Sequence, residues 1–141
     1  MRKAMLAILL GTLCVAACES DSNLLFVTPL RTFVLRTVNG SPLPAVVFDS
    51  VGRGLRLEAL SGTIVLNPNS TFTSVTQFRQ TSSGVLSERT ATCSGTFTIA
   101  GTTVTFVGTQ ITADCTGTFT GVLVENTLTT FIRGATALYS R

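Results

Sequence analysis

The sequence predicts an all-β protein: a single antiparallel up-and-down barrel of about eight strands, preceded by a short N-terminal signal helix. Threonine is the compositional signature, with 25 among 141 residues, and together with Val, Ile and Phe it favours the pleated, half-buried surface of a strand. After residue 18, short alternating stretches are broken by Gly, Asn and Ser, and no helical periodicity is sustained. Short connections favour pairing between neighbouring strands, and closure into a barrel removes sheet edges. A β-sandwich with two packed sheets is the alternative.

The N-terminus has the layout of a secretory signal peptide. Arg2 and Lys3 precede an uninterrupted apolar run over residues 4–13, and small residues precede Cys18. The apolar run is shorter than the roughly 20 residues that a membrane-spanning helix needs. We therefore expect a signal peptide over residues 1–17, a lipidated tether over residues 18–29 and a barrel domain over residues 30–141.

The motif Val15-Ala16-Ala17-Cys18 resembles the lipobox of bacterial lipoproteins. The resemblance implies that the Cys18 thiol takes a diacylglycerol, that a peptidase cuts before it, and that the freed amine is acylated, for example with palmitate. Two or more acyl chains would hold the protein stably on a membrane. Glu19 favours the outer membrane of a bacterial cell envelope, facing the periplasm. Cleavage by an ordinary signal peptidase and an uncleaved segment are the alternatives, and Cys14 is a poor competitor beside bulky Leu13.

The barrel domain reads as a succession of short strands. The first covers residues 31–38 and ends at Asn39-Gly40, a dipeptide that tolerates positive φ in a turn. Residues 41–44 contain two prolines, which predicts a strand-free link, and Gly62 is expected to form a bulge. Residues 24–27 are either an extra edge strand or a plug. The further strands are expected at residues 45–51, 55–66, 71–79, 85–99, 102–107, 115–124, 127–132 and 135–141.

Phenylalanines recur at positions that the alternation places inside. Seven of them would fill the interior of so short a barrel, because eight strands leave room for side chains or for one small ligand. The segment CSGTFT at residues 93–98 recurs as CTGTFT at residues 115–120. We interpret this repeat as strands entering the same core at equivalent heights rather than as a binding motif. The inward phenylalanines are expected to be Phe33, Phe72, Phe78, Phe97, Phe106, Phe119 and Phe131.

Cys93 and Cys115 remain as a pair once Cys14 is removed and Cys18 is lipidated. An even pair in an oxidising compartment predicts a disulfide, whereas metal ligation has no histidine to support it. Two strand spacings amount to about 9.5 Å, but bridged Cα atoms lie within about 7 Å. With a turn at Ala100-Gly101, Cys93 would face Gly108. The bridge therefore requires the intervening strand to end near Gly108, where no side chain blocks the crossing.

The charged residues indicate neither nucleic-acid binding nor catalysis. Without Arg2 and Lys3, eight arginines face seven acids, so the mature chain is close to neutral and has no basic patch. The chain has no histidine, which excludes Ser-His and Cys-His pairs and a histidine metal centre; we assign no catalytic, cofactor or metal residue. The scattered carboxylates are Asp49, Glu58, Glu88, Asp114 and Glu125. The arginines that could line a polar mouth are Arg36, Arg53, Arg56, Arg79, Arg89 and Arg133.

Two segments resemble bacterial lipoproteins with a lipocalin-like barrel. They are the opening strand and turn at residues 33–44 (FVLRTVNGSPLP) and the hairpin at residues 95–106 (GTFTIAGTTVTF). The chain has no tryptophan, so the glycine-x-tryptophan signature of true lipocalins is absent. We expect a non-enzymatic structural or interaction role in the envelope, with a filled barrel and protein partners on its loops. A binding or carrier module for a small apolar ligand is the alternative, and an enzyme or enzyme inhibitor ranks below both. The oligomeric state stays open.

Overall fold

The computed structural model describes residues 31–109, 115 and 117–141. Its regular elements are ten strands and one short 3-10 helix. In chain order they are β1 (Arg31–Val38), β2 (Ser41–Pro42), β3 (Ala45–Ser50), η1 (Val51–Arg53), β4 (Leu55–Leu66), β5 (Thr71–Ser82), β6 (Val85–Ala100), β7 (Thr103–Gly108), β8 (Thr118–Val124), β9 (Thr127–Ile132) and β10 (Ala135–Ser140).

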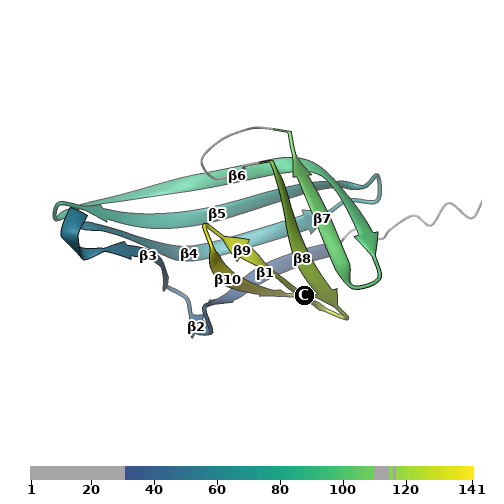
Figure 1. Cartoon of the computed structure of the whole chain (residues 1–141), viewed down its shortest axis with the longest axis horizontal. Coiled ribbons are helices and arrows are strands. Elements are labelled where there is room, and N and C mark those ends of the chain that lie inside the picture. The colour runs from purple at the N-terminus through teal and green to yellow at the C-terminus, as the bar shows by residue number, and fades with distance from the viewer. Residues whose placement is uncertain (1–30, 110–114, 116) are drawn as a thin grey trace, which may run out of the picture.

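Eight of these strands close into an antiparallel barrel (Figure 1). From β4 to β10 each strand pairs with the next in the sequence, and β1 closes the ring by pairing with both β10 and β4. β2 adds to β1 and β3 adds to β4 outside the ring. The up-and-down barrel is therefore confirmed, and the β-sandwich alternative is wrong. In the part of the chain that the structure describes, no helix is long and apolar enough to cross a membrane.

The expected strand-free link at residues 41–44 is wrong. Residues 41–44 are not free of strand, because Ser41 pairs with Val38 and Pro42 with Thr37. Asn39 (φ 50°) and Gly40 (φ 78°) form a two-residue turn that brings the chain straight back. Proline is tolerated in β2 because β2 lies at an edge and needs no donor on its outer side.

Gly62 is not the bulge of β4. The register of β4 against β5 shifts between Ala59 and Ser61, whereas Gly62 pairs regularly with Thr76. A Cβ on Gly62 would lie 3.2 Å from the Cβ of Leu35. Glycine is therefore used here for close packing against β1 rather than for irregular backbone.

Strands of unequal length produce a second feature, which we call the arm. β4, β5 and β6 have 12, 12 and 16 residues, but β7 has 6. β1 covers residues 63–66 of β4, and β7 covers residues 95–100 of β6. The remaining lengths continue past the barrel as a four-stranded sheet, which projects to the left in Figure 1. The arm consists of residues 45–50, 55–59, 78–82 and 85–91.

Aromatic side chains fill the closed part of the barrel. Phe106 stacks on Phe119 with ring centroids 4.7 Å apart, and Phe72 meets Phe106 edge-on at 5.0 Å. Phe97 lies 6.5 Å from Phe106 on the other side. These four rings, with Phe33 and Phe78, confirm six of the seven inward phenylalanines, although Phe119 is only partly buried.

The seventh, Phe131, points outward and is 58% exposed. Its neighbours Leu128 and Thr130 are buried, so the strand alternation directs Phe131 away from the core.

Candidate functional site at the open end of the barrel

A cavity of about 250 Å³ lies at the end of the barrel that adjoins the arm. Its walls come from strands far apart in the sequence: β5 and β6 on one side, β9 and β10 on the other, with Cys115 and the start of β8 between them. The main lining side chains are Thr76, Phe78, Ala91, Phe119, Thr130, Ile132 and Tyr139.

Tyr139 is the titratable group deepest in this site. It is 1% exposed, and burial raises the pKa of its phenol to about 12, while a side-chain hydrogen bond with Thr76 acts in the opposite direction. The group is therefore a neutral phenol at physiological pH. Its high pKa makes it a poor general base, since an efficient catalytic pKa lies near the working pH.

A second hollow lies on the inner face of the arm. It measures about 340 Å³ and is lined by Phe48, Leu55, Leu57, Gln80 and Arg133. Arg133, in the turn between β9 and β10, lines both hollows. The barrel cavity is smaller than the roughly 300–1,000 Å³ usual for drug-sized ligands, because the aromatic cluster occupies the rest of the interior.

The structure brings Cys93 and Cys115 to disulfide distance, with their Cα atoms 5.0 Å apart. β7, the strand between them, ends at Gly108 as the crossing requires. A Cβ on Gly108 would lie only 2.7 Å from the Cys115 sulfur and 3.6 Å from the Cys93 sulfur. The expected partner was wrong by two residues, because Gly95 rather than Cys93 faces Gly108.

The repeated segments serve packing. Their cysteines meet each other, and their phenylalanines, Phe97 and Phe119, pair in register with Phe106 on β7 from either side. Their shared glycines differ in role. A Cβ on Gly95 would overlap the carbonyl of Val107, whereas Gly117 takes a positive φ of 60°.

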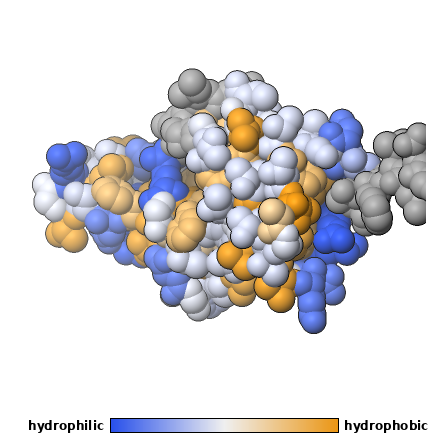
Figure 2. Space-filling view, turned by 45° about the vertical axis from the view of Figure 1, so that its right-hand side comes forward, coloured by the Kyte–Doolittle hydropathy of each residue, from blue (hydrophilic) through white to orange (hydrophobic). Residues whose placement is uncertain are grey.

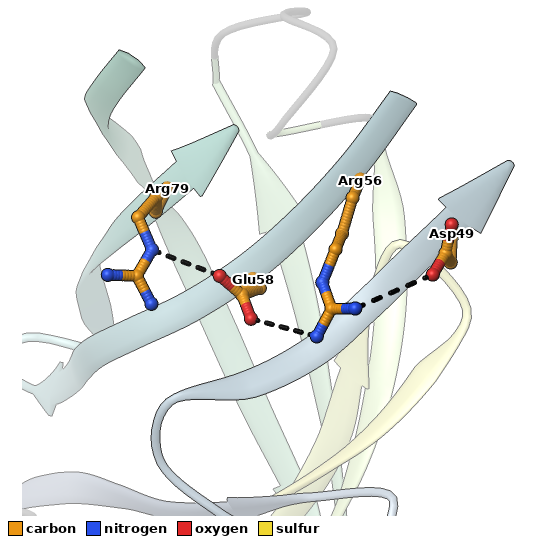
Figure 3. A network of polar contacts seen from close by, with 4 residues as sticks. All are labelled: Asp49, Arg56, Glu58 and Arg79. Atoms are coloured by element: carbon orange, nitrogen blue, oxygen red, sulfur yellow. Dashed lines mark hydrogen bonds and ion pairs between the residues drawn. The ribbon is translucent and has the colours of Figure 1, made fainter. Parts of the chain in front are cut away.

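Four charged residues form a network away from the cavity, on the outer face of the arm (Figure 3). The Glu58 carboxylate accepts hydrogen bonds from Arg79 and Arg56, each at 3.0 Å, and Arg56 reaches Asp49 at 3.8 Å. The hydrogen bond from Arg79 lowers the pKa of Glu58 below 4.5; Arg56 adds to this effect, and partial burial opposes it. Each acid thus has a cationic partner, which is the arrangement of a structural network rather than of a catalytic carboxylate pair.

The other arginines are dispersed. Arg36 donates to the Ser140 hydroxyl at 2.8 Å, and Arg53 is exposed at the tip of the arm. The Arg89 guanidinium lies 5.0 Å from the centre of the Phe78 ring, so it and Arg133 are the two arginines that the structure brings to the open end. Of the six arginines that could line a polar mouth, these two lie at the open end, and the other four lie elsewhere on the strands and the arm.

Several predicted positions lie outside the described residues. They include Cys18, the predicted lipidation site, Cys14, which is predicted to be removed with the signal peptide, Asp114 and the segment of residues 24–27. Glu125 lies in the turn between β8 and β9 with a φ of 51°.

Sequence reasoning missed the arm and the long edge of β6. The signal was present in the predicted lengths, since a strand of 15 residues followed by one of 6 must leave much of its edge without that partner. Within residues 31–109, 115 and 117–141, no group of three or more His, Cys, Asp or Glu side chains could hold a metal ion. No protein-family model, curated protein or solved structure matches the chain.

Proposed function

We propose that this protein is a lipid-anchored protein of the bacterial cell envelope with a non-enzymatic interaction role. The observation that carries the proposal is the signal layout ending in Val15-Ala16-Ala17-Cys18. The filled barrel supports recognition by the outer surface, because four clustered phenylalanines take up the closed part of the interior.

The position of the tether suggests how the domain is oriented. β1 begins at Arg31, which pairs with Leu66 at the last residue of β4. The arm tip lies at the first residue of β4, about 36 Å away for a strand of this length. Arg31 and the arm tip are therefore at opposite ends of β4, and an anchor at Cys18, upstream of Arg31, favours an orientation in which the arm projects away from the membrane.

A second candidate function is binding of a small apolar ligand. The observation in its favour is that two hollows, of about 250 and 340 Å³, share Arg133 at the open end. Apolar walls with a few polar groups are typical of small-molecule sites. The volume of the barrel cavity, about 250 Å³, favours a compact molecule over a long acyl chain.

The anchor is tested by expressing the full chain in a Gram-negative host fed an alkyne-tagged fatty acid. The variant Cys18→Ser is compared with the matched control Cys14→Ser. We expect wild type and Cys14→Ser to carry the label and to sediment with membranes, and Cys18→Ser to carry no label. Label retained on Cys18→Ser, or wild-type protein without label, would overturn the proposal.

A further inference from the structure

We propose that the free edge of β6 over residues 85–91 accepts an extended segment of a partner protein as an added strand, with a basic residue opposite Glu88. The inference deepens the proposed interaction role and rests on it, and the choice of a partner over a second copy rests on the charge of the edge. Addition of a strand to a sheet edge is an established mode of peptide recognition, in which main-chain hydrogen bonds supply affinity and alternate side chains supply specificity.

Among the residues that the structure describes, β7 pairs with β6 only over residues 95–100, which leaves residues 85–91 without a strand on this side. Thr109 extends this contact by one step, since its backbone N–H donates to the Ser94 carbonyl at 2.9 Å. On this side of β6, no described strand pairs with residues 85–91. Figure 1 shows this length of β6 along the upper margin of the arm.

The backbone groups that face the open edge can be identified because hydrogen-bonding direction alternates from one residue to the next along a strand. A residue in a strand directs its N–H and C=O to the same side, and the next residue directs them to the other. The Ser94 carbonyl faces β7, whereas the N–H of Phe97 donates to Ser70 on the β5 side at 2.9 Å. The β5–β6 register is unbroken from Val85 to Thr96. Even-numbered residues therefore present their donors and acceptors to the edge: Leu86, Glu88 and Thr90.

The two edges of the arm differ in protection. β3, at the opposite edge, follows Pro44 and carries a register shift between Val46 and Phe48, with exposed Asp49 after it. Proline, bulges and charges are the devices that keep sheet edges from pairing. Residues 85–91 of β6 contain no proline and no bulge, and their charged residues are Glu88 and Arg89. The end of this edge is apolar, with Val85 69% and Leu86 62% exposed, and Figure 2 shows hydrophobic and hydrophilic residues intermixed over the arm.

Charge along the strands indicates what the added strand carries. In register across the outer face of the arm, Glu58 lies opposite Arg79, and Arg79 opposite Glu88. This row alternates in sign and ends at the open edge on an exposed carboxylate. Opposite charges directly across a sheet stabilise pairing, so the next strand continues the row with Lys or Arg. On the added strand, an apolar residue two positions from this Lys or Arg would lie opposite Leu86.

A second copy of the chain fits this edge poorly. Two identical β6 edges related by a two-fold axis pair antiparallel, because parallel strands cannot exchange hydrogen bonds symmetrically at equal heights. An antiparallel pair that covers residues 85–91 of both copies is centred on Glu88 and places the two exposed Glu88 carboxylates directly opposite each other. Like charges directly opposite each other destabilise strand pairing.

The experiment measures amide hydrogen exchange of the purified full-length protein in micelles, with and without the peptide Thr-Val-Thr-Lys-Thr-Val-Thr. We expect slower exchange at Leu86, Glu88 and Thr90, while the amides of Ser87 and Arg89, already directed at β5, stay unchanged. Protection without that alternation, or none at saturating peptide, overturns the proposal. So does protection of the same amides without peptide that rises with protein concentration, because it identifies a second copy as the occupant.

Variants supply the matched controls. Glu88→Lys should weaken binding of the Lys peptide about two- to fivefold and strengthen binding of the same peptide with Glu for Lys. Thr90→Pro removes one edge donor without touching the β5 ladder and should weaken binding about tenfold, whereas Thr90→Val should not. Equal affinities across these variants would refute the proposal that the peptide binds at this edge of β6. Edge protection in a chain that carries no lipid would refute only the anchor.

Discussion

Tyr139 shows how one buried side chain sets a measurable property of the whole fold. Its phenol is enclosed by the barrel, so ionising it in the folded state is costly, and the hydrogen bond with Thr76 offsets only part of this cost. The chain holds one tyrosine and, after residue 3, no lysine. Between pH 9 and pH 12 the titration of the barrel is therefore dominated by one group.

We expect the contribution of Tyr139 to the free energy of unfolding to be constant below pH 10 and to fall between pH 10 and about pH 12. The folded pKa is raised to about 12 from 10, so the stabilisation is complete below the unfolded pKa and is lost as the pH rises toward the folded one. The loss amounts to about 2–3 kcal/mol. Urea unfolding across this range measures it, and Tyr139→Phe is the control that should show no slope. A tyrosinate absorbance titration with a midpoint near 10 in the folded protein would contradict this account.

At the residue scale, the sequence was most informative where one residue type has one physical use. Asn39-Gly40 was correctly expected to turn, because positive φ suits these residues. Gly62 was misread because a glycine in a strand signals either a bulge or close packing, and only the position of Leu35 decides between them. The prediction that Phe131 points into the barrel was wrong for a similar reason, since the hydrophobicity of a strand does not say which of its faces meets the core.

The short strand β7 matters because its last residue is the point where the Cys93–Cys115 bridge passes. Gly108 leaves 2.7 Å between its hypothetical Cβ and the Cys115 sulfur. We expect Gly108→Ala to lower the free energy of unfolding by about 1–3 kcal/mol through overpacking at a site that cannot expand. Denaturant unfolding of the oxidised protein measures this, with Gly52→Ala as control, since a Cβ there meets nothing within 4 Å. Equal stability of Gly108→Ala and Gly52→Ala would show that the bridge does not cross at Gly108.

The arm is stabilised on its outer face by the four residues of Figure 3. We expect Glu58→Gln to lower the free energy of unfolding by up to about 1 kcal/mol at pH 7, because partly exposed ion pairs contribute little. Glu58 has a lowered pKa, so its contribution is present above pH 4.5 and is lost as the pH falls further. Variant and wild type should therefore converge as the pH falls below the lowered pKa of Glu58. Glu125→Gln, in an exposed turn, is the control, and a difference that persists unchanged once Glu58 is protonated would exclude the ion-pair explanation.

At the element scale, strand identity was predictable and strand length was less so. Alternation located β1, β4 and β7 closely, because each is bounded by turn residues. The arm could not be found from periodicity, since a strand that leaves the barrel keeps the same alternation as one that stays in it. Only the difference in length between β6 and β7 indicates that the arm exists.

For the whole molecule, the closed barrel and the arm have different features. The ring is filled by aromatic side chains and joined to the N-terminal segment at Arg31, while the arm carries the exposed edge at the other end of β4. The sequence predicted the barrel because its short turns force neighbouring strands to pair. It could not predict which end is open, because that depends on how far each strand runs past its neighbours.

The central claim is that a lipid at Cys18 anchors a barrel whose interior holds no long acyl chain. Native mass spectrometry of the protein extracted from envelopes tests it directly. We predict one species with the mass of residues 18–141 plus a diacylglycerol, with or without one further acyl chain, less two hydrogens for the Cys93–Cys115 bridge, and with no dissociable adduct. A chain without covalent lipid, or a long-chain lipid that leaves on collisional activation, would contradict the account.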